Sequence, residues 1–224
     1  DDEAIGRAAA DHFAERDFRH YGFVGDPRFR WSENRCRAFS AAVFGRGHVV
    51  DVFPITAGRR GRPRAKTAGD PPDDDESIEE WLRGLPKPVA VFTCYDIRGR
   101  QVLEACRRCG IEVPDQVAVL GVDNDELLCG LASPPLSSII PDAAGAGRLA
   151  AGLLERLMRG ERLERDEWLL APLGIATRQS TDVLAIDDDF VVAAVRLIRD
   201  HACRGIKVVD VVASLKTSRR VLEH

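Results

Sequence analysis

Polar residues directly follow two apolar stretches of this sequence. The stretch VAVFTC is followed by Tyr95 and Asp96, and the stretch VAVLGV is followed by Asp123 and Asn124. Carboxylate and amide groups of this kind form paired hydrogen bonds with the neighbouring hydroxyl groups of a polyol. If both stretches are strands of one parallel sheet, their carboxyl ends meet at the edge where ligands bind. The four residues therefore predict a site for a monosaccharide or another polyol.

A second group of candidate residues lies in the segment RFRWSENR. It contains Trp31, whose indole ring can pack on the C–H face of a sugar. It also contains Arg35, whose guanidinium can donate two parallel N–H hydrogen bonds. Structural interpretations remain open as well, because Asp123 and Asn124 are good caps for a following helix and Trp31 is equally suited to core packing. The stretch DNDE lacks the glycine and the distal glutamate of a calcium loop, so no metal ligand is predicted here.

The first 180 residues alternate between short apolar runs and helical stretches. The expected strands are 21–25, 48–53, 88–94 and 116–123, and the expected helices are 3–16, 33–44, 77–84 and a stretch ending at Cys109. Runs that are continuously apolar are typical of strands buried on both faces. The pattern predicts an α/β fold with a doubly wound parallel sheet. The Gly-, Pro- and Arg-rich residues 56–75 are expected to form a solvated surface loop, although their basic run also suits nucleic acid.

Composition and charge narrow the class of protein. The chain has 224 residues, of which 45% are hydrophobic and 30% charged, and this balance is typical of globular proteins. No apolar run approaches the roughly 20 residues of a membrane helix, and the first residues do not resemble a signal peptide, so a cytoplasmic protein is expected. The cysteines lack the spacing of a disulfide framework. Cys106 and Cys109 form a C-x-x-C near the end of a helix, where a redox pair or zinc site is not favoured.

Residues 91–128 resemble the effector-binding domain of the lactose and galactose repressor family, which shares its fold with the periplasmic sugar-binding proteins. The shared features are an apolar strand, a polar pair containing Asp, a helix, and a strand ending in G-x-D; the segment between helix and strand reads GIEVPDQ here. Similar blocks lie at 1–25, 134–160 and 178–181. In that family another α/β lobe precedes the position of Asp1, so the resemblance implies that this chain holds mostly one lobe of a periplasmic-binding-protein fold.

The resemblance also implies roles for single residues. Tyr95 or Asp96 corresponds to the polar pair that touches sugar hydroxyls, Asp123 to the Asp of G-x-D, and Arg35 to the Arg of S-x-x-R. Tyr95 replaces the Asn that is common at its position. A direct contact from Tyr95 to the sugar therefore does not follow from the resemblance.

The final residues differ from the rest in charge and in pattern. Residues 190–224 carry seven Lys or Arg against three Asp or Glu, a net charge of +4, which leaves −8 for the rest of the chain. The stretches AIDDDFVVAAVRLIRDHACRG and IKVVDVVASL predict two helices. A turn at Lys216 and Thr217 then leads to a third helix capped by Ser218, which gives the order of a helix-turn-helix unit.

In such a unit the last helix enters the major groove of DNA with its first residues at the bases. The expected DNA contacts are Thr217, Ser218, Arg219 and Arg220, and Arg219 is expected at a base edge. The order of residues resembles the DNA-binding domain of the arabinose-regulator (AraC) family, of which most of the first helix-turn-helix unit is present. The predicted domains are thus 1–181, for sugar binding, and 182–224, a partial all-α DNA-binding domain.

A repressor-type sugar lobe followed by an arabinose-regulator-type domain resembles the family of xylose operon regulators, bacterial transcription activators that bind D-xylose. The resemblance implies a homodimer that binds D-xylose or a related pentose and operator DNA, and no cofactor. Two other classes remain open: a sugar-binding transport protein, and a carbohydrate-acting enzyme that uses Asp96 and Asp123 as acid and base. The sequence offers no nucleophile elbow, phosphate loop or metal set for the enzyme.

Overall fold

The computed structural model describes residues 1–54, 75–182, 189–201 and 205–217. The chain divides into two compact units, residues 1–183 and 184–224. The division falls two residues after the boundary expected between a sugar-binding and a DNA-binding part. Most of the expected loop at 56–75 lies outside the described residues, but Asp75 belongs to a helix.

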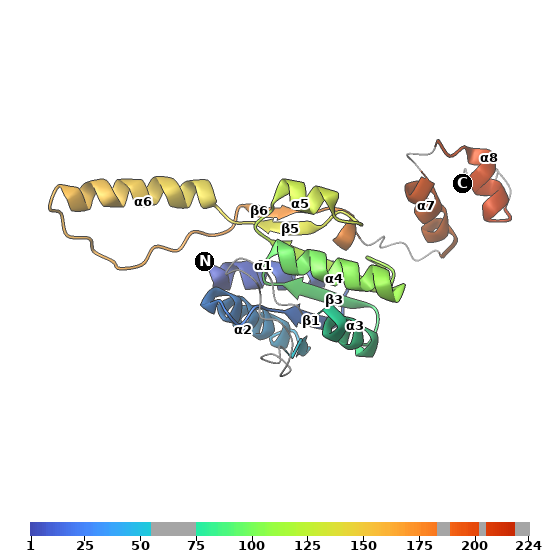
Figure 1. The fold of residues 1–224 in the computed structure, drawn as a ribbon, viewed down its shortest axis with the longest axis horizontal. Helices are drawn as coiled ribbons and strands as arrows, with labels where there is room; N and C mark the ends of the chain where they lie inside the picture. The colour runs from blue at the N-terminus through green and yellow to red at the C-terminus, as the bar shows by residue number, and fades with distance from the viewer. Residues whose placement is uncertain (55–74, 183–188, 202–204, 218–224) are drawn as a thin grey trace. The chain divides into compact units, whose positions relative to one another are not determined.

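The first unit is built on a six-stranded sheet with the order β2-β1-β3-β4-β5-β6 (Figure 1). Its strands are β1 (His20–Val24), β2 (Val50–Val52), β3 (Val89–Thr93), β4 (Val117–Val122), β5 (Ser137–Ile140) and β6 (Gly174–Ala176). The first five strands pair in parallel, and β6 is antiparallel to β5. The parallel doubly wound sheet predicted from the sequence is confirmed, and the sequence did not reveal β5 and β6.

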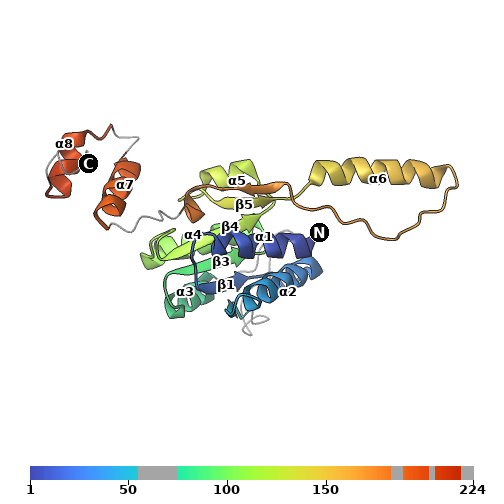
Figure 2. The ribbon, with the colours of Figure 1, turned by 180° about the vertical axis from the view of Figure 1, so that it is seen from behind.

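Helices cover both faces of the sheet, as Figures 1 and 2 show from opposite sides. One face packs on α1 (Asp2–Ala14) and α2 (Arg30–Phe44), and the other on α3 (Asp75–Gly84) and α4 (Asp96–Cys109). Alternate side chains of β3 point to opposite faces of the sheet. Ala90 and Phe92 pack in the core under α1 and α2, whereas Val89 and Val91 pack in the core under α3 and α4. Every residue of β3 and β4 is buried, which explains their continuous apolar character.

Two predicted element boundaries were wrong, and the first of them affects the candidate site. Helix α2 begins at Arg30 rather than at residue 33, so Trp31 and Ser32 lie in its first turn. The helix starts early because the Ser32 amide donates to the Phe29 carbonyl (3.1 Å) while the Ser32 hydroxyl accepts from the Asp26 amide (2.9 Å). Strand β2 is also shorter than the predicted 48–53.

The remaining helices of the first unit differ in burial. Helix α5 (Glu126–Leu131) buries Cys129, whereas α6 (Ala143–Met158) has no buried residue. The apolar side chains Leu154, Leu157 and Met158 are 58%, 51% and 81% exposed. A face of this kind is unusual for a helix that has a complete set of packing partners.

The second unit contains two described helices, α7 (Asp189–His201) and α8 (Val208–Ser214). Ala194 of α7 and Val211 of α8 are buried. Lys216 has a positive φ of 50°, and the Thr217 amide donates to the Val212 carbonyl (3.1 Å), so the chain turns after α8 as the sequence predicted. The predicted third helix lies outside the described residues. Among the described helices of both units, none has the length and apolar character needed to cross a bilayer.

The contact between α1 and α2 depends on a residue without a side chain. A Cβ atom on Gly6 would lie 2.6 Å from the Cβ of Ala38 and 2.7 Å from the amide nitrogen of Phe39. Gly6→Ala is therefore expected to lower the free energy of unfolding by about 1–3 kcal/mol, because the backbone of α2 has to move. Chemical denaturation followed by circular dichroism measures the change.

Gly130→Ala is the matched control, because Gly130 also lies in a helix but a Cβ there would meet nothing within 4 Å. This variant is expected to be as stable as the wild type, or more stable by about 0.5–1 kcal/mol. Equal stability of Gly6→Ala and Gly130→Ala would contradict the packing described for α1 and α2.

Candidate functional site

The candidate site lies at the carboxyl ends of β1, β3 and β4. The sheet order changes direction between β1 and β3, and in open α/β sheets ligands bind beyond the strand ends at such a switch point. Asp26 follows β1, Tyr95 and Asp96 follow β3, and Asp123 follows β4. The first turn of α2 adds Trp31 to the same end of the sheet. Tyr95 and Asp123, which the sequence singled out, thus lie at the same end of the sheet.

Three aromatic rings form a connected wall at this edge. The rings of Phe29 and Trp31 are stacked with centroids 4.8 Å apart, and Tyr95 meets Trp31 edge to face at 5.6 Å. Trp31 is partly buried and also packs against the α1–α2 core, so its structural interpretation is correct in part. Its remaining surface can still cover the apolar face of a ring. Phe29 was not anticipated from the sequence.

The wall is held by a partly buried ion pair, between Asp26 and Arg28, that sequence reasoning missed. Asp26 is 1% exposed, and its carboxylate accepts from Arg28 Nη2 (2.7 Å), Arg28 Nε (2.9 Å) and the Tyr95 hydroxyl (3.1 Å). Burial alone would raise the pKa of Asp26, but the hydrogen bonds and charge of Arg28 outweigh it and the pKa lies below its ordinary value. The Tyr95 hydroxyl is therefore committed to Asp26, and Tyr95 contributes mainly its ring to this edge of the sheet.

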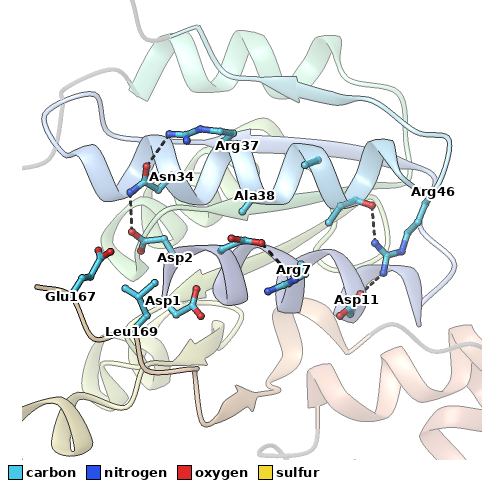
Figure 3. Close-up of a pocket in the computed structure, with 13 residues that line it drawn as sticks. Asp1, Asp2, Arg7, Asp11, Asn34, Arg37, Ala38, Arg46, Glu167 and Leu169 are labelled. Carbon is cyan, nitrogen blue, oxygen red and sulfur yellow. Dashed lines mark hydrogen bonds and ion pairs between the residues drawn. The ribbon is translucent and has the colours of Figure 1, made fainter. Parts of the chain in front are cut away.

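Arg35 connects the wall to α1 and β3. It is buried; its Nη1 donates to the Cys94 carbonyl (2.6 Å) and its Nε to Asp2 (3.0 Å). Its guanidinium carbon lies 4.7 Å from the centre of the Trp31 ring, a cation–π contact. Figure 3 shows Asp2 at the end of the groove between α1 and α2, where Asn34 also reaches it (3.4 Å). That groove, of about 560 Å³, is a separate feature and is not lined by Trp31, Tyr95 or Asp123.

Asp96 is 2% exposed, and protein groups occupy both of its carboxylate oxygens. Oδ1 accepts from the Ser138 hydroxyl (2.6 Å), while Oδ2 accepts from the Asp125 amide (2.9 Å) and the Cys129 thiol (3.3 Å). Burial raises the pKa of Asp96, and these hydrogen bonds oppose the rise. Asp96 therefore belongs to the buried framework beneath the strand ends rather than to the solvent-exposed groups at this edge.

The loop after β4 carries the exposed polar groups of the site. Asp123 and Asn124 have positive φ values of 110° and 51°, and Asp125 caps α5 by accepting from the Leu128 amide (2.9 Å). The alternative interpretation, that Asp123 and Asn124 cap this helix, does not hold, because the N-cap position is occupied by Asp125. Asn124 Oδ1 accepts from Arg178 Nη2 (2.8 Å), a partner that the sequence did not suggest.

Asp123 has the most perturbed pKa among the exposed carboxylates of the site. The surrounding protein desolvates its carboxylate and raises its pKa from 3.8 to about 6; Arg35 opposes the rise, and Asp96 and Asp125 add to it. A carboxylate open to solvent on one side and flanked by acidic groups is a strong acceptor for hydroxyl donors. Arg35, whose guanidinium lies over the Trp31 ring, is also the charged group that lowers the pKa of Asp123.

Other predicted features lie away from this site. Cys106 is fully buried and burial raises its thiol pKa to about 12, which disfavours the redox interpretation of the Cys106–Cys109 pair. Within the described ranges, no three His, Cys, Asp or Glu side chains form a possible metal site. Of the predicted DNA contacts only Thr217 is described, and Ser218, Arg219 and Arg220 lie outside the described residues.

Comparison with known proteins agrees with this fold. The family model of the periplasmic binding protein-like domain matches residues 10–181. The chain is 31% identical to the xylose operon regulatory protein of Escherichia coli K12 and 30% identical to that of Haemophilus influenzae, over the whole chain in both cases. It spans 56% and 57% of these relatives' lengths. The solved structure of a xylose-binding transcription activator, 31% identical, covers all of the chain with a TM-score of 0.76, and the chain covers 57% of that structure.

Because the pKa of Asp123 is raised, removing its charge is expected to change the stability of the protein by an amount that depends on pH. Between about pH 4 and 6 the folded chain binds more protons at this residue than the unfolded chain, so the free energy of unfolding falls as pH rises through that window. Above pH 6 the ionised Asp123 destabilises the fold. Asp123→Asn is therefore expected to melt at a higher temperature than the wild type at pH 7.5, and the difference should shrink as the pH approaches 4.

Thermal melts across this pH range test the prediction, with Asp166→Asn as a control that removes the same charge from an exposed position. A constant difference between Asp123→Asn and the wild type at all pH values would show that Asp123 titrates as an ordinary carboxyl.

Proposed function

Because this chain belongs to the family of periplasmic-binding-protein-like domains, we propose that it forms the sugar-binding part of a bacterial transcription regulator, with D-xylose or a related pentose as the effector. One observation carries the proposal: exposed Asp123, half-buried Asn124 and the aromatic wall lie at the same end of the sheet, and Arg35, which contacts the Trp31 ring, is close enough for its charge to lower the pKa of Asp123. The relatives named as xylose operon regulators and a xylose-binding activator support the choice of ligand.

The proposed binding mode assigns a different task to each side of the cleft. Asp123 accepts hydrogen bonds from two neighbouring sugar hydroxyls, and Asn124 adds an amide to the same loop. Trp31 covers the C–H face of the sugar, supported by Phe29 and by the guanidinium of Arg35. The ligand of this edge is therefore a small, uncharged polyol.

We assign Tyr95 and Asp96 to positioning rather than to direct hydroxyl contact. The Tyr95 hydroxyl donates to Asp26, and the oxygens of Asp96 accept from Ser138, Asp125 and Cys129. These bonds fix the wall and the Asp123 loop relative to β3. A sugar gains affinity when the groups that receive it are already in place.

The rest of the cleft is proposed to come from a second lobe. The relatives are nearly twice as long as this chain, and α6 presents three apolar side chains, Leu154, Leu157 and Met158, that are more than half exposed. We propose that α6 packs into the second lobe, so that the sugar is held between the two lobes and favours their closed arrangement. Only a difference in affinity between the open and closed states allows the sugar to shift that equilibrium.

Residues 184–224 are proposed to form the start of the DNA-binding domain. Arg219 is the proposed base contact, and Thr217, Ser218 and Arg220 share phosphate and base contacts at the operator. The exposed apolar residues Phe44, Val49 and Val52 beside the edge strand β2 support a homodimer, since an open apolar edge readily pairs with a second copy. A protein with this task works in the cytoplasm.

Two alternatives make different predictions. A carbohydrate-acting enzyme would need Asp96 as a proton donor or acceptor, but both of its oxygens are engaged by the protein. Incubation with pentoses followed by product analysis separates this class, because a regulator returns the sugar unchanged. A transport protein would bind the sugar in the same cleft but would show no sugar-dependent change in operator binding.

Removing the exposed carboxylate tests the proposed ligand site. Asp123→Ala in the intact regulator is expected to weaken D-xylose binding by at least about tenfold, because two charge-assisted hydrogen bonds to hydroxyls are lost. Isothermal titration calorimetry measures the affinity. Asp166→Ala removes an exposed carboxylate outside the cleft and should bind D-xylose like the wild type. Unchanged affinity in Asp123→Ala would refute the site.

A further inference from the structure

Arg178 joins the loop after β4 to the last described segment of the first unit. Its side chain donates to Asn124 Oδ1 (2.8 Å) and to the Leu136 carbonyl (2.9 Å), and its backbone amide donates to the Ser137 hydroxyl (2.8 Å). Asn124 and Arg178 are 54 residues apart in the sequence. Arg178 thus holds the sugar loop and strand β5 at the same time.

The contact with Arg178 fixes which way the Asn124 amide faces. A guanidinium has only N–H donors, so the Asn124 atom that meets it has to be the oxygen. The Nδ2 group is then turned away from Arg178. With Asp123 supplying acceptors, an Asn124 side chain held this way adds donors to the same loop, and a sugar hydroxyl needs both kinds of partner.

The segment that begins at Arg178 is locked into the sheet by buried hydroxyls. Ser137, Ser180 and Thr181 are 0% exposed. Ser180 Oγ accepts from the Ser137 amide (2.8 Å) and donates to the Val119 carbonyl (2.6 Å), and Thr181 Oγ1 donates to Ser137 Oγ (2.8 Å). A buried polar network with all its members paired is stiff, so a shift at one end is felt along it.

Helix α1 closes the same network from the other side. His12 Nε2 lies 2.8 Å from Thr181 Oγ1, and Arg16 Nε donates to the Thr181 carbonyl (3.0 Å). Because Thr181 Oγ1 already gives its proton to Ser137, His12 has to be the donor, which defines its Nε2–H tautomer. One residue later, at Asp182, the chain leaves this network towards the second unit, which begins at residue 184.

We propose that Arg178 is a positioning residue that orients the Asn124 amide for the sugar and couples the occupied loop to the exit segment Arg178–Asp182. The inference rests on the proposed function and adds the route by which sugar binding reaches the helical unit. A bound sugar restrains the Asn124 side chain, and Asn124 restrains the Arg178 guanidinium through their hydrogen bond. Arg178, whose backbone amide bonds to Ser137, then orders the exit segment. Order in the sugar loop and order in the exit segment are coupled, and such coupling is reciprocal. A partner that orders the exit segment therefore also increases the affinity for the sugar.

The test combines sugar affinity with hydrogen–deuterium exchange in the intact regulator, using D-xylose as the probe. In the wild type, saturating D-xylose is expected to slow exchange of the Ser180 and Asp182 amides, which donate to the Pro135 and Gln179 carbonyls. In Arg178→Met, D-xylose is expected to bind about tenfold more weakly. At saturation of this variant the exchange of the exit segment should no longer respond to sugar.

Two further variants separate this role from a general contribution to stability. Asn124→Asp keeps an acceptor for Arg178 but lacks the Nδ2 donors, so its exit segment should still respond to saturating D-xylose while the sugar binds about tenfold more weakly. Ser180→Ala removes buried hydrogen bonds from the exit segment without touching Asn124. It should melt earlier, but its exit segment should still respond to saturating D-xylose, because the contact between Arg178 and Asn124 is intact.

The outcomes distinguish the two proposals. If the wild type gives no binding heat with D-xylose, the proposed function is wrong and this inference falls with it. If D-xylose binds but the exit segment does not respond, or responds equally in Arg178→Met, the coupling through Arg178 is wrong and the proposed function stands. Wild-type affinity in Asn124→Asp would refute the orientation of the amide.

Discussion

The buried carboxylate of Asp96 is the constraint on which the candidate site depends. It lies at the start of α4 and accepts from a side chain of β5, from the backbone of the loop after β4 and from a thiol of α5. Gly121 allows this approach, because a Cβ atom at that position would collide with the Asp96 carboxylate. The loop is thereby fixed in the positive-φ conformation that presents Asp123 and Asn124 to the cleft. Three further hydrogen bonds hold the same two residues: the Asp123 amide donates to the Ile139 carbonyl (3.1 Å), the Asn124 amide to the Ser138 hydroxyl (3.0 Å) and Arg178 to Asn124 Oδ1 (2.8 Å). Together with the buried carboxylate they stabilise a conformation that most side chains avoid.

This arrangement places negative charges close together. Asp96 and Asp125 both raise the pKa of Asp123, and burial raises the pKa of Asp96 itself. Fixing acidic groups side by side lowers stability, and binding sites often accept such a loss in return for groups already arranged for a ligand. On the opposite side of the cleft, the Arg28–Asp26 pair and the Arg35–Asp2 pair are neutral overall. The exposed negative charge of the site therefore lies on the sugar loop, where hydroxyl donors are recognised.

The sequence predicted the parallel sheet because β3 and β4 are uninterrupted apolar runs, and it predicted Tyr95, Asp96, Asp123 and Asn124 because they follow those runs. It did not predict that Asp96 is buried. The local sequence around an Asp at the start of a helix is the same whether its carboxylate faces a ligand or a neighbouring loop. Asp26 follows β1 and satisfies the same rule, so the strand-end criterion applied to every strand would have found it. The Arg178–Asn124 contact joins distant parts of the chain and has no local signal.

The central claim is that Asp123 receives the sugar while Asp96 holds the loop from below. A crystal structure of the intact regulator with bound D-xylose tests it most directly. The account predicts sugar hydroxyls on the Asp123 carboxylate, the sugar ring against Trp31, and Asp96 still bonded to Ser138 and to the Asp125 amide. A sugar bound directly by Asp96, with the Ser138 and Asp125 bonds broken, or a sugar bound away from this edge of the sheet, would contradict it.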